Sequence, residues 1–226
     1  MDKLLQTVEV LSSLPGVSGD EGLIREAIAK RLEGICQLET DPLGNLIAFK
    51  KGKRAAEKKV LFSAHMDEVG FIVTFVEESG LLRFSACGGI DPRVVAGKAV
   101  LVGEKAVPGI IGLKATHQAE EKEKKTPPKL DALYIDIGAE NRAQAEEYVL
   151  PGDRAVFDSR FQRLGEDRIM GKAFDDRAGC ALLLQLAERD LPYDCWFSFT
   201  VQEENGCIGG MTAGYQVAPD IAVVVE

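Results

Sequence analysis

Four groups of acidic and imidazole side chains stand beside apolar runs in this sequence. Their members are His65 with Asp67, Asp175 with Asp176, Glu203 with Glu204, and Glu226. One imidazole with several carboxylates is a donor set that suits Zn²⁺, Co²⁺ or Mn²⁺. Ligand sites of open α/β sheets form outside the carboxyl ends of the strands. The sequence therefore predicts a divalent-metal site at one edge of a sheet.

His65 follows the apolar run VLFSA, and Asp67 stands two positions later. Alternation along an extended strand places both side chains on one side. A carboxylate there can accept the second N–H of the imidazole and select the tautomer that binds a metal. The alternative is a hydrogen-bonded histidine at a strand end, with no ligand.

The remaining acids also allow two interpretations. Asp175 precedes an apolar helical run, where an aspartate either caps the helix or binds cations. Glu203 and Glu204 repel each other unless a cation compensates or water surrounds them. In a metal site, one glutamate can bind the ion while the other takes a proton from water. Glu226 follows IAVVV and is uninformative alone.

Apolar periodicity predicts the elements that position these groups. Helices are expected at 3–13, after Ser18, at 176–189 and at 208–216; strands are expected within 35–50 and at 60–64, 195–201 and 221–225. Ser18 and Glu21 have the spacing of a capping box at the start of the second helix. The charged run 50–59 has the composition of a solvated loop.

The pattern of apolar and turn-forming residues changes in the middle of the chain. Residues 69–162 consist of short β-rich runs separated by glycine, proline and charged turns, which predicts a small barrel or sandwich. On either side, 1–68 and 163–226 have α/β character. The simplest organisation is one α/β domain, in two parts, interrupted by a β-rich insertion.

Composition excludes several classes of function. The 226 residues are 46% apolar and carry a formal charge of −9, a poor match to nucleic-acid phosphates or anionic lipid. No stretch approaches the roughly 18 apolar residues that span a membrane, and the N-terminus does not resemble a signal peptide. Five cysteines without a CxxC pair indicate reduced thiols. We therefore expect a cytoplasmic protein without nucleic-acid or membrane partners.

The motifs SLPGVSGDE, DPLGN, SAHMDEVGF, GKAFDDR and QEENG occur in this order. The set resembles the dinuclear-metal aminopeptidases that include the glutamyl, deblocking and tetrahedral aminopeptidases; some members are labelled endoglucanase M. The resemblance covers essentially all 226 residues. It implies an α/β fold, with a mixed-sheet catalytic domain that has helices on both faces. It further implies that an inserted small β-barrel-like dimerisation domain interrupts this catalytic domain.

The resemblance also implies a role for each candidate residue. It places His65 and Glu226 on one metal ion, Glu204 on a second, Asp175 between the two, Glu203 as general base, and Asp67 as the residue that orients His65. Two divalent ions per subunit, Zn²⁺ or Co²⁺, peptide substrates and a homo-oligomer are implied too. That oligomer would be a dimer through the insertion, or a dodecamer. His117 matches no ligand position and is expected to be structural or at the surface.

The chain departs from the family pattern in three respects. Asn205 stands where an apolar residue commonly follows the two glutamates, and position 226 is a glutamate rather than an aspartate. Family members also continue beyond this point and supply a second metal-binding histidine. We therefore expect a C-terminally truncated chain that is inactive alone.

Three functions remain open on the sequence. The first is a metal-dependent aminopeptidase. The second is a glycoside hydrolase that uses Glu203 and Glu204, although adjacent residues do not easily flank a sugar bond at the required separation of about 5–9 Å. The third is a non-catalytic metal-binding or assembly module.

Overall fold

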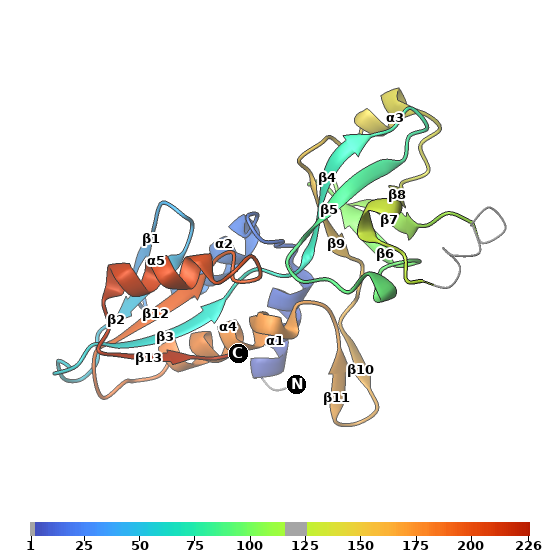
Figure 1. Cartoon of the computed structure of the whole chain (residues 1–226). Coiled ribbons are helices and arrows are strands. Elements are labelled where there is room, and N and C mark those ends of the chain that lie inside the picture. The colour runs from blue at the N-terminus through green and yellow to red at the C-terminus, as the bar shows by residue number, and fades with distance from the viewer. Residues whose placement is uncertain (1–2, 116–125) are drawn as a thin grey trace. The chain divides into compact units, whose positions relative to one another are not determined.

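The computed structural model describes residues 3–115 and 126–226 (Figure 1). The chain divides into two compact units. Met1–Glu68 and Arg160–Glu226 form the first, which we call the α/β unit; Val69–Ser159 forms the second, which we call the barrel unit. The middle of the sequence thus folds as a unit of its own.

A five-stranded mixed sheet forms the centre of the α/β unit. In spatial order its strands are β1 (Gln37–Thr40), β2 (Leu46–Lys50), β12 (Cys195–Thr200), β3 (Val60–His65) and β13 (Ile221–Val224). β2 is antiparallel to β1 and β12, whereas β3 is parallel to β12 and β13. The carboxyl ends of β12, β3 and β13 therefore meet at one edge, where the predicted site residues follow them.

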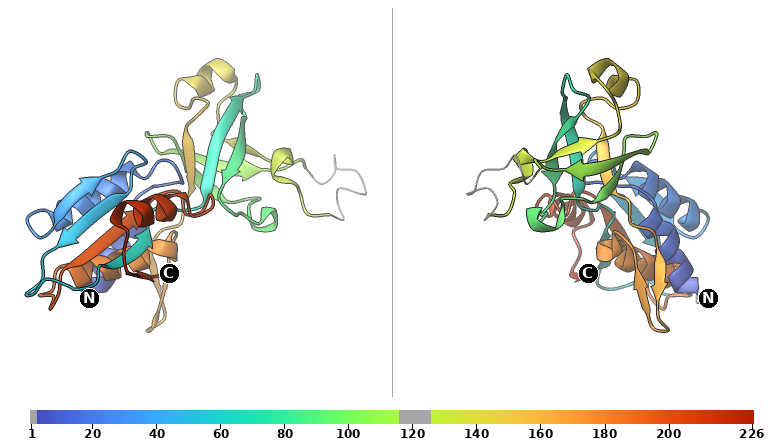
Figure 2. Two further views of the ribbon diagram at one scale, coloured as in Figure 1. Left: turned by 60° about the vertical axis from the view of Figure 1, so that its left-hand side comes forward. Right: turned by 90° about the vertical axis from the view of Figure 1, so that its right-hand side faces the viewer.

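Helices cover both faces of this sheet (Figure 1, Figure 2). The helices α1 (Lys3–Ser13), α2 (Gly22–Leu32) and α4 (Phe174–Ala187) pack on one face, in a core that includes Phe197 and Phe199. Ala213 and Val217 of α5 (Ile208–Val217) pack on the other face. The prediction of a mixed α/β sheet with helices on both faces is confirmed.

Six strands close a barrel in the second unit. They are β4 (Gly70–Val76), β5 (Leu82–Cys87), β8 (Tyr134–Asp136), β7 (Val107–Gly112), β6 (Ala99–Val102) and β9 (Arg154–Phe157). Alternation along β4 buries Phe71 and Val73 in an apolar core. The described residues of this unit also form α3 (Arg142–Glu146) and the 3₁₀ turns Pro92–Val94 and Leu130–Ala132. The prediction of an inserted, barrel-like β region is confirmed. Of the two architectures that the sequence allowed, the closed ring of strands is a barrel and not a sandwich.

Two local features differ from the sequence-based expectations. The capping box is wrong: α2 follows Glu21 as its N-cap residue, but no side chain caps the helix. Ser18 and Glu21 instead bond to residues far away in sequence. A two-stranded hairpin, β10 (Gln162–Leu164) with β11 (Arg168–Met170), was not predicted. Its strands are three residues long and mostly exposed, so they carry little periodic signal.

Across the described ranges, no helix is both long and apolar enough to cross a membrane. All five cysteines lie within these ranges, and all are free. Their free state agrees with the reduced thiols expected from the sequence.

Candidate metal centre

Three of the four predicted metal ligands converge at the edge of the α/β sheet. His65 ends β3, Asp175 lies in the first turn of α4, and Glu226 follows β13. Each offers one ligand atom, and these atoms all lie within 4.8 Å of one another. His65 Nε2 lies 2.9 Å from Asp175 Oδ1. An imidazole nitrogen with two carboxylate oxygens fits a divalent cation.

The surroundings of His65 direct its Nε2 atom toward this group. Nδ1 lies 3.1 Å from the main-chain oxygen of Asp67 and 3.4 Å from its carboxylate Oδ1. Burial alone would lower the pKa of His65, but the carboxylates of Asp67 and Asp175 outweigh it and raise that pKa to about 9. The field that stabilises a proton on the ring also favours a metal cation at Nε2.

Asp67 connects the His65 segment to the glutamate pair. Its buried carboxylate accepts the main-chain N–H of Glu203 at 2.9 Å and that of Glu204 at 3.1 Å. The Ser18 hydroxyl donates to the same carboxylate. Burial would raise the pKa of Asp67, but its bonds to His65, Ser18 and these N–H groups lower it. The carboxylate is therefore held in its charged form.

Glu203 and Glu204 occupy different surroundings. Glu203 Oε2 lies 3.9 Å from His65 Nε2, and Glu203 Oε1 accepts a hydrogen bond from Cys207 Sγ at 3.1 Å. Burial raises the pKa of Glu204. Among the described residues, the convergent group consists of His65, Asp175 and Glu226, and Glu204 is not a member. His117 lies outside the described residues.

A cavity of about 160 Å³ lies beside this group. His65, Glu203 and Glu226 line it, together with Ser63, Ala64, Asp176, Thr200, Cys207, Gly210, Val224 and Val225. The side chain of Glu203 thus faces the same space as two of the convergent ligands. The cavity has room for a small chemical group at the edge of the sheet.

Asp176, to which the sequence assigns no site role, also contacts His65. Asp175 and Asp176 have non-helical backbone angles, and Asp176 Oδ1 accepts the main-chain N–H of Gly179 at 2.9 Å, which caps the regular part of α4 that follows. Asp176 Oδ2 accepts the N–H of His65 at 3.2 Å. Burial raises the pKa of Asp176 to about 6. Because Asp176 caps the helix, Asp175 is left to face His65.

A buried ionic network, which the sequence does not predict, joins α1, the residues after β3 and the start of α4. The fully buried Arg177 donates from Nε to Met66 O at 2.5 Å and from Nη1 to Leu11 O at 2.7 Å. Lys172 Nζ donates to the buried carboxylate of Glu68 at 2.7 Å. The only sequence signal was that these charged residues lie inside the motifs GKAFDDR and SAHMDEVGF.

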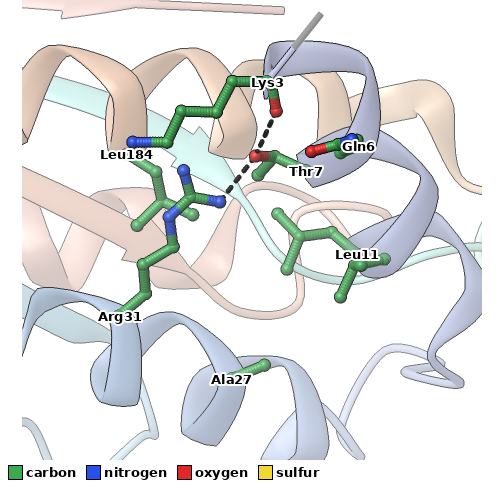
Figure 3. Close-up of a pocket in the computed structure, with 8 residues that line it drawn as sticks. Lys3, Gln6, Thr7, Leu11, Ala27, Arg31 and Leu184 are labelled. Atoms are coloured by element: carbon green, nitrogen blue, oxygen red, sulfur yellow. Dashed lines mark hydrogen bonds between the residues drawn. The ribbon is translucent and has the colours of Figure 1, made fainter. Parts of the chain in front are cut away.

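A second cavity, of about 240 Å³, lies among α1, α2 and α4 (Figure 3). Leu11, Ala27 and Leu184 line it, with Lys3, Gln6, Thr7, Val10 and Arg31. Arg31 donates to the Thr7 hydroxyl at 2.5 Å, as Figure 3 shows. These lining residues include no histidine, aspartate or glutamate, so this cavity lacks the donor set of the convergent group.

Residues 44–226 match the family described as M42 glutamyl aminopeptidase, and the chain belongs to that family. It is similar to the TET aminopeptidase of the marine sediment archaeon Thaumarchaeota archaeon SCGC AB-539-E09, with 35% identity and a TM-score of 0.93. That alignment covers 100% of this chain and 66% of the archaeal one.

Two further solved structures are similar. The TET1 peptidase of Pyrococcus horikoshii, which can assemble into a tetrahedron or a large octahedral shell, has 34% identity and a TM-score of 0.89 over 99% of this chain and 68% of its own. A Thermotoga maritima protein named endoglucanase has 43% identity and a TM-score of 0.83, over 97% and 65%. The chain spans 64–66% of the length of two curated relatives that it matches.

Proposed function

We propose that the protein to which this chain belongs is a metal-dependent aminopeptidase that removes N-terminal residues from peptides. The observation that carries the proposal is the convergence of His65, Asp175 and Glu226 beside a cavity that Glu203 also lines. Family membership supports it, because the family is described as glutamyl aminopeptidase and the archaeal TET relative is named an aminopeptidase.

Two divalent ions per subunit are part of the proposal. His65, Asp175 and Glu226 would hold one ion, and Glu204, together with Asp175, would hold the other. Imidazole nitrogen and carboxylate oxygen suit both Zn²⁺ and Co²⁺. Such ions supply Lewis-acid polarisation of a peptide carbonyl and lower the pKa of water.

The chain's own residues would carry the proton transfers. Glu203 accepts a proton from the attacking water and delivers it to the departing amine. Its position 3.9 Å from His65 Nε2 keeps this carboxylate beside the ligands. Asp67 orients His65 and, through the main-chain N–H groups of Glu203 and Glu204, holds the base in register with the ligands.

We further propose a cytoplasmic homo-oligomer. The barrel unit would form a dimer, and dimers would assemble into a dodecamer. Support comes from the Pyrococcus horikoshii relative, which assembles into closed shells, and from the five free cysteines. Mass photometry of the full-length protein tests the assembly.

The test of the chemistry is a peptidase assay on the full-length protein, with amino-acid p-nitroanilides, in the presence of Co²⁺ or Zn²⁺ and after chelation. We expect activity only with metal. Glu203→Gln should lower kcat by about 10²–10⁴-fold, the range that a general base contributes. The control is Glu166→Gln, the same change at an exposed residue of the α/β unit. Unchanged turnover in Glu203→Gln would contradict the mechanism.

The same preparation tests the alternative that the protein is a glycoside hydrolase. This alternative is retained because the Thermotoga maritima relative is named endoglucanase. Glu203 and Glu204 are adjacent, a poor geometry for two carboxylates on either side of a sugar bond. Hydrolysis of carboxymethylcellulose that survives chelation would favour that alternative over a peptidase.

A further inference from the structure

We propose that Ser18 and Glu21, in the loop between α1 and α2, are positioning residues that hold the Glu203–Glu204 segment in its working conformation. The inference rests on the proposed function, because it assigns these two side chains a task in that chemistry. The inference follows from the hydrogen-bond partners of Ser18 and Glu21, which are Asp67 and Gln202.

Three consecutive main-chain N–H groups after β12 each meet a carboxylate oxygen. The N–H of Gln202 donates to Glu21 Oε1 at 3.0 Å. The next two, of Glu203 and Glu204, donate to Asp67 Oδ1 at 2.9 Å and Oδ2 at 3.1 Å. Two carboxylates from distant parts of the chain therefore define the path of the backbone that carries the base.

Ser18 fixes the orientation of one of these carboxylates. The hydroxyl is 2% exposed and donates to Asp67 Oδ2, the atom that also accepts from Glu204. The loop around Ser18 is itself anchored, because Ser18 N donates to Glu68 O at 3.3 Å and Glu68 N donates to Gly16 O at 3.0 Å. Rotation of the Asp67 carboxylate would break its hydrogen bonds to Ser18, Glu203 and Glu204 together.

Glu21 supports the turn from the other side. Its carboxylate is buried, with the residue 5% exposed, and Oε1 accepts the N–H of Gly19 at 2.7 Å as well as that of Gln202. Gln202 has a φ of +52°, in the left-handed region that non-glycine residues seldom adopt. A conformation of this kind persists only where the surroundings hold it. Glu21 supplies one such restraint directly before Glu203.

A purely structural role explains this arrangement poorly. Burial of a carboxylate is costly, and an apolar side chain of similar volume commonly serves stability as well or better. Burial indeed raises the pKa of Glu21. Two carboxylates directed at one short segment are explained by a requirement for position, since small displacements of catalytic groups are expensive in rate.

The experiment compares paired variants in the full-length enzyme. Ser18→Ala and Glu21→Ala remove the bonding atoms, whereas Ser18→Thr retains a hydroxyl and Glu21→Gln retains an acceptor oxygen. Ser13→Ala and Glu26→Ala make the same changes at exposed positions of α1 and α2. We measure kcat and KM separately, Co²⁺ affinity by titration calorimetry, and the thermal midpoint.

We expect Ser18→Ala and Glu21→Ala to lower kcat by roughly tenfold to a hundredfold while KM changes little, as for a misplaced catalytic group. Co²⁺ binding should weaken severalfold, because Glu204 moves with the segment. Ser18→Thr and Glu21→Gln should recover most of both losses, and the two exposed controls should match the wild type. Ser18→Ala is the smaller change, and it keeps the test valid if Glu21→Ala does not fold.

Wild-type kcat and Co²⁺ affinity in both alanine variants would overturn the proposal. Equal losses in Glu21→Gln and Glu21→Ala would also overturn it, since the retained acceptor would then be irrelevant. Failure of the proposed function looks different: the wild type would show no metal-dependent peptidase activity. If Glu203→Gln inactivates the enzyme but the alanine variants keep kcat, only the positioning role fails.

Discussion

The α/β unit and the barrel unit differ in what they bury. Among the described residues, every buried polar or charged side chain lies in the α/β unit, including Glu21, Asp67, Glu68 and Arg177. The described barrel residues bury apolar side chains instead, such as Phe71, which packs against Phe84 and Phe157. Both units nevertheless have contiguous apolar cores.

This difference shows where position matters more than packing. Apolar burial stabilises a core without directional demands, at about 25 cal/mol per Å². Buried charges stabilise only when their partners are in place, and they fix the geometry of those partners. In the α/β unit, the buried Asp67, Glu68 and Arg177 bond to segments that adjoin the candidate metal centre.

The largest expected effect is in the α/β unit. Arg177→Met should lower the free energy of unfolding by about 3–5 kcal/mol, because a buried charge network loses one partner. Glu68 and the main-chain oxygens of Leu11 and Met66 would lose their bonds to the guanidinium. Urea unfolding measures the change. A cost below about 1 kcal/mol, the value of surface pairs, would contradict the importance of this network.

The next effect is in the barrel unit. Leu82→Ala should cost about 2–5 kcal/mol, because it opens a cavity in an apolar core. Leu150→Ala, at a residue 55% exposed, is the matched control. Titration calorimetry should show unchanged Co²⁺ affinity in both variants, since the candidate ligands lie in the other unit. A loss of affinity in Leu82→Ala would break the separation of roles between the units.

A smaller effect depends on pH. Burial raises the pKa of Glu21 above its usual 4.5, so the folded state holds this proton more tightly than the unfolded state. The resulting stability is present below pH 4.5 and is lost as the pH rises through the folded pKa. Relative to wild type, Glu21→Gln should therefore gain stability between pH 4 and pH 7, measured by urea unfolding without metal.

The control for this pH dependence is Glu26→Gln, at an exposed position on α2. Its stability relative to wild type should stay flat over the same range. If the Glu21→Gln curve fell relative to wild type as the pH rose, the carboxylate would be stabilised in the folded state, contrary to its buried setting.

The smallest effect is expected at the surface of the barrel unit. Arg93 and Asp91 form an exposed ion pair, with Nη2 and Oδ2 2.5 Å apart. Water and salt screen such pairs. Arg93→Ala should leave the thermal midpoint unchanged, in contrast to Arg177→Met. A clear drop would show that charge placement matters in the barrel unit as well.

Much of the fold could be predicted because periodicity is a property of neighbouring residues. The helix Lys3–Ser13 and the strands Val60–His65 and Cys195–Thr200 lie where the apolar pattern placed them. The convergence of His65, Asp175 and Glu226 followed from the rule that ligands collect at the carboxyl ends of parallel strands. For Glu203 and Glu204, chemistry suggested a division of roles, but only the family resemblance implied which would bind metal and which would act as base.

The amino-acid sequence by itself determined most helices and strands of the α/β unit, the β-rich character of the middle of the chain and the family. Only the tertiary structure decided what Ser18 and Glu21 do. Their spacing of three residues fits a capping box, yet their partners lie 49 and 181 residues away. A local pattern identifies a polar side chain but not the distant group to which it bonds. Here the parallel pairing of β12 with β3, which sets Thr200 beside His65, brings Glu203 and Glu204 within reach of Asp67.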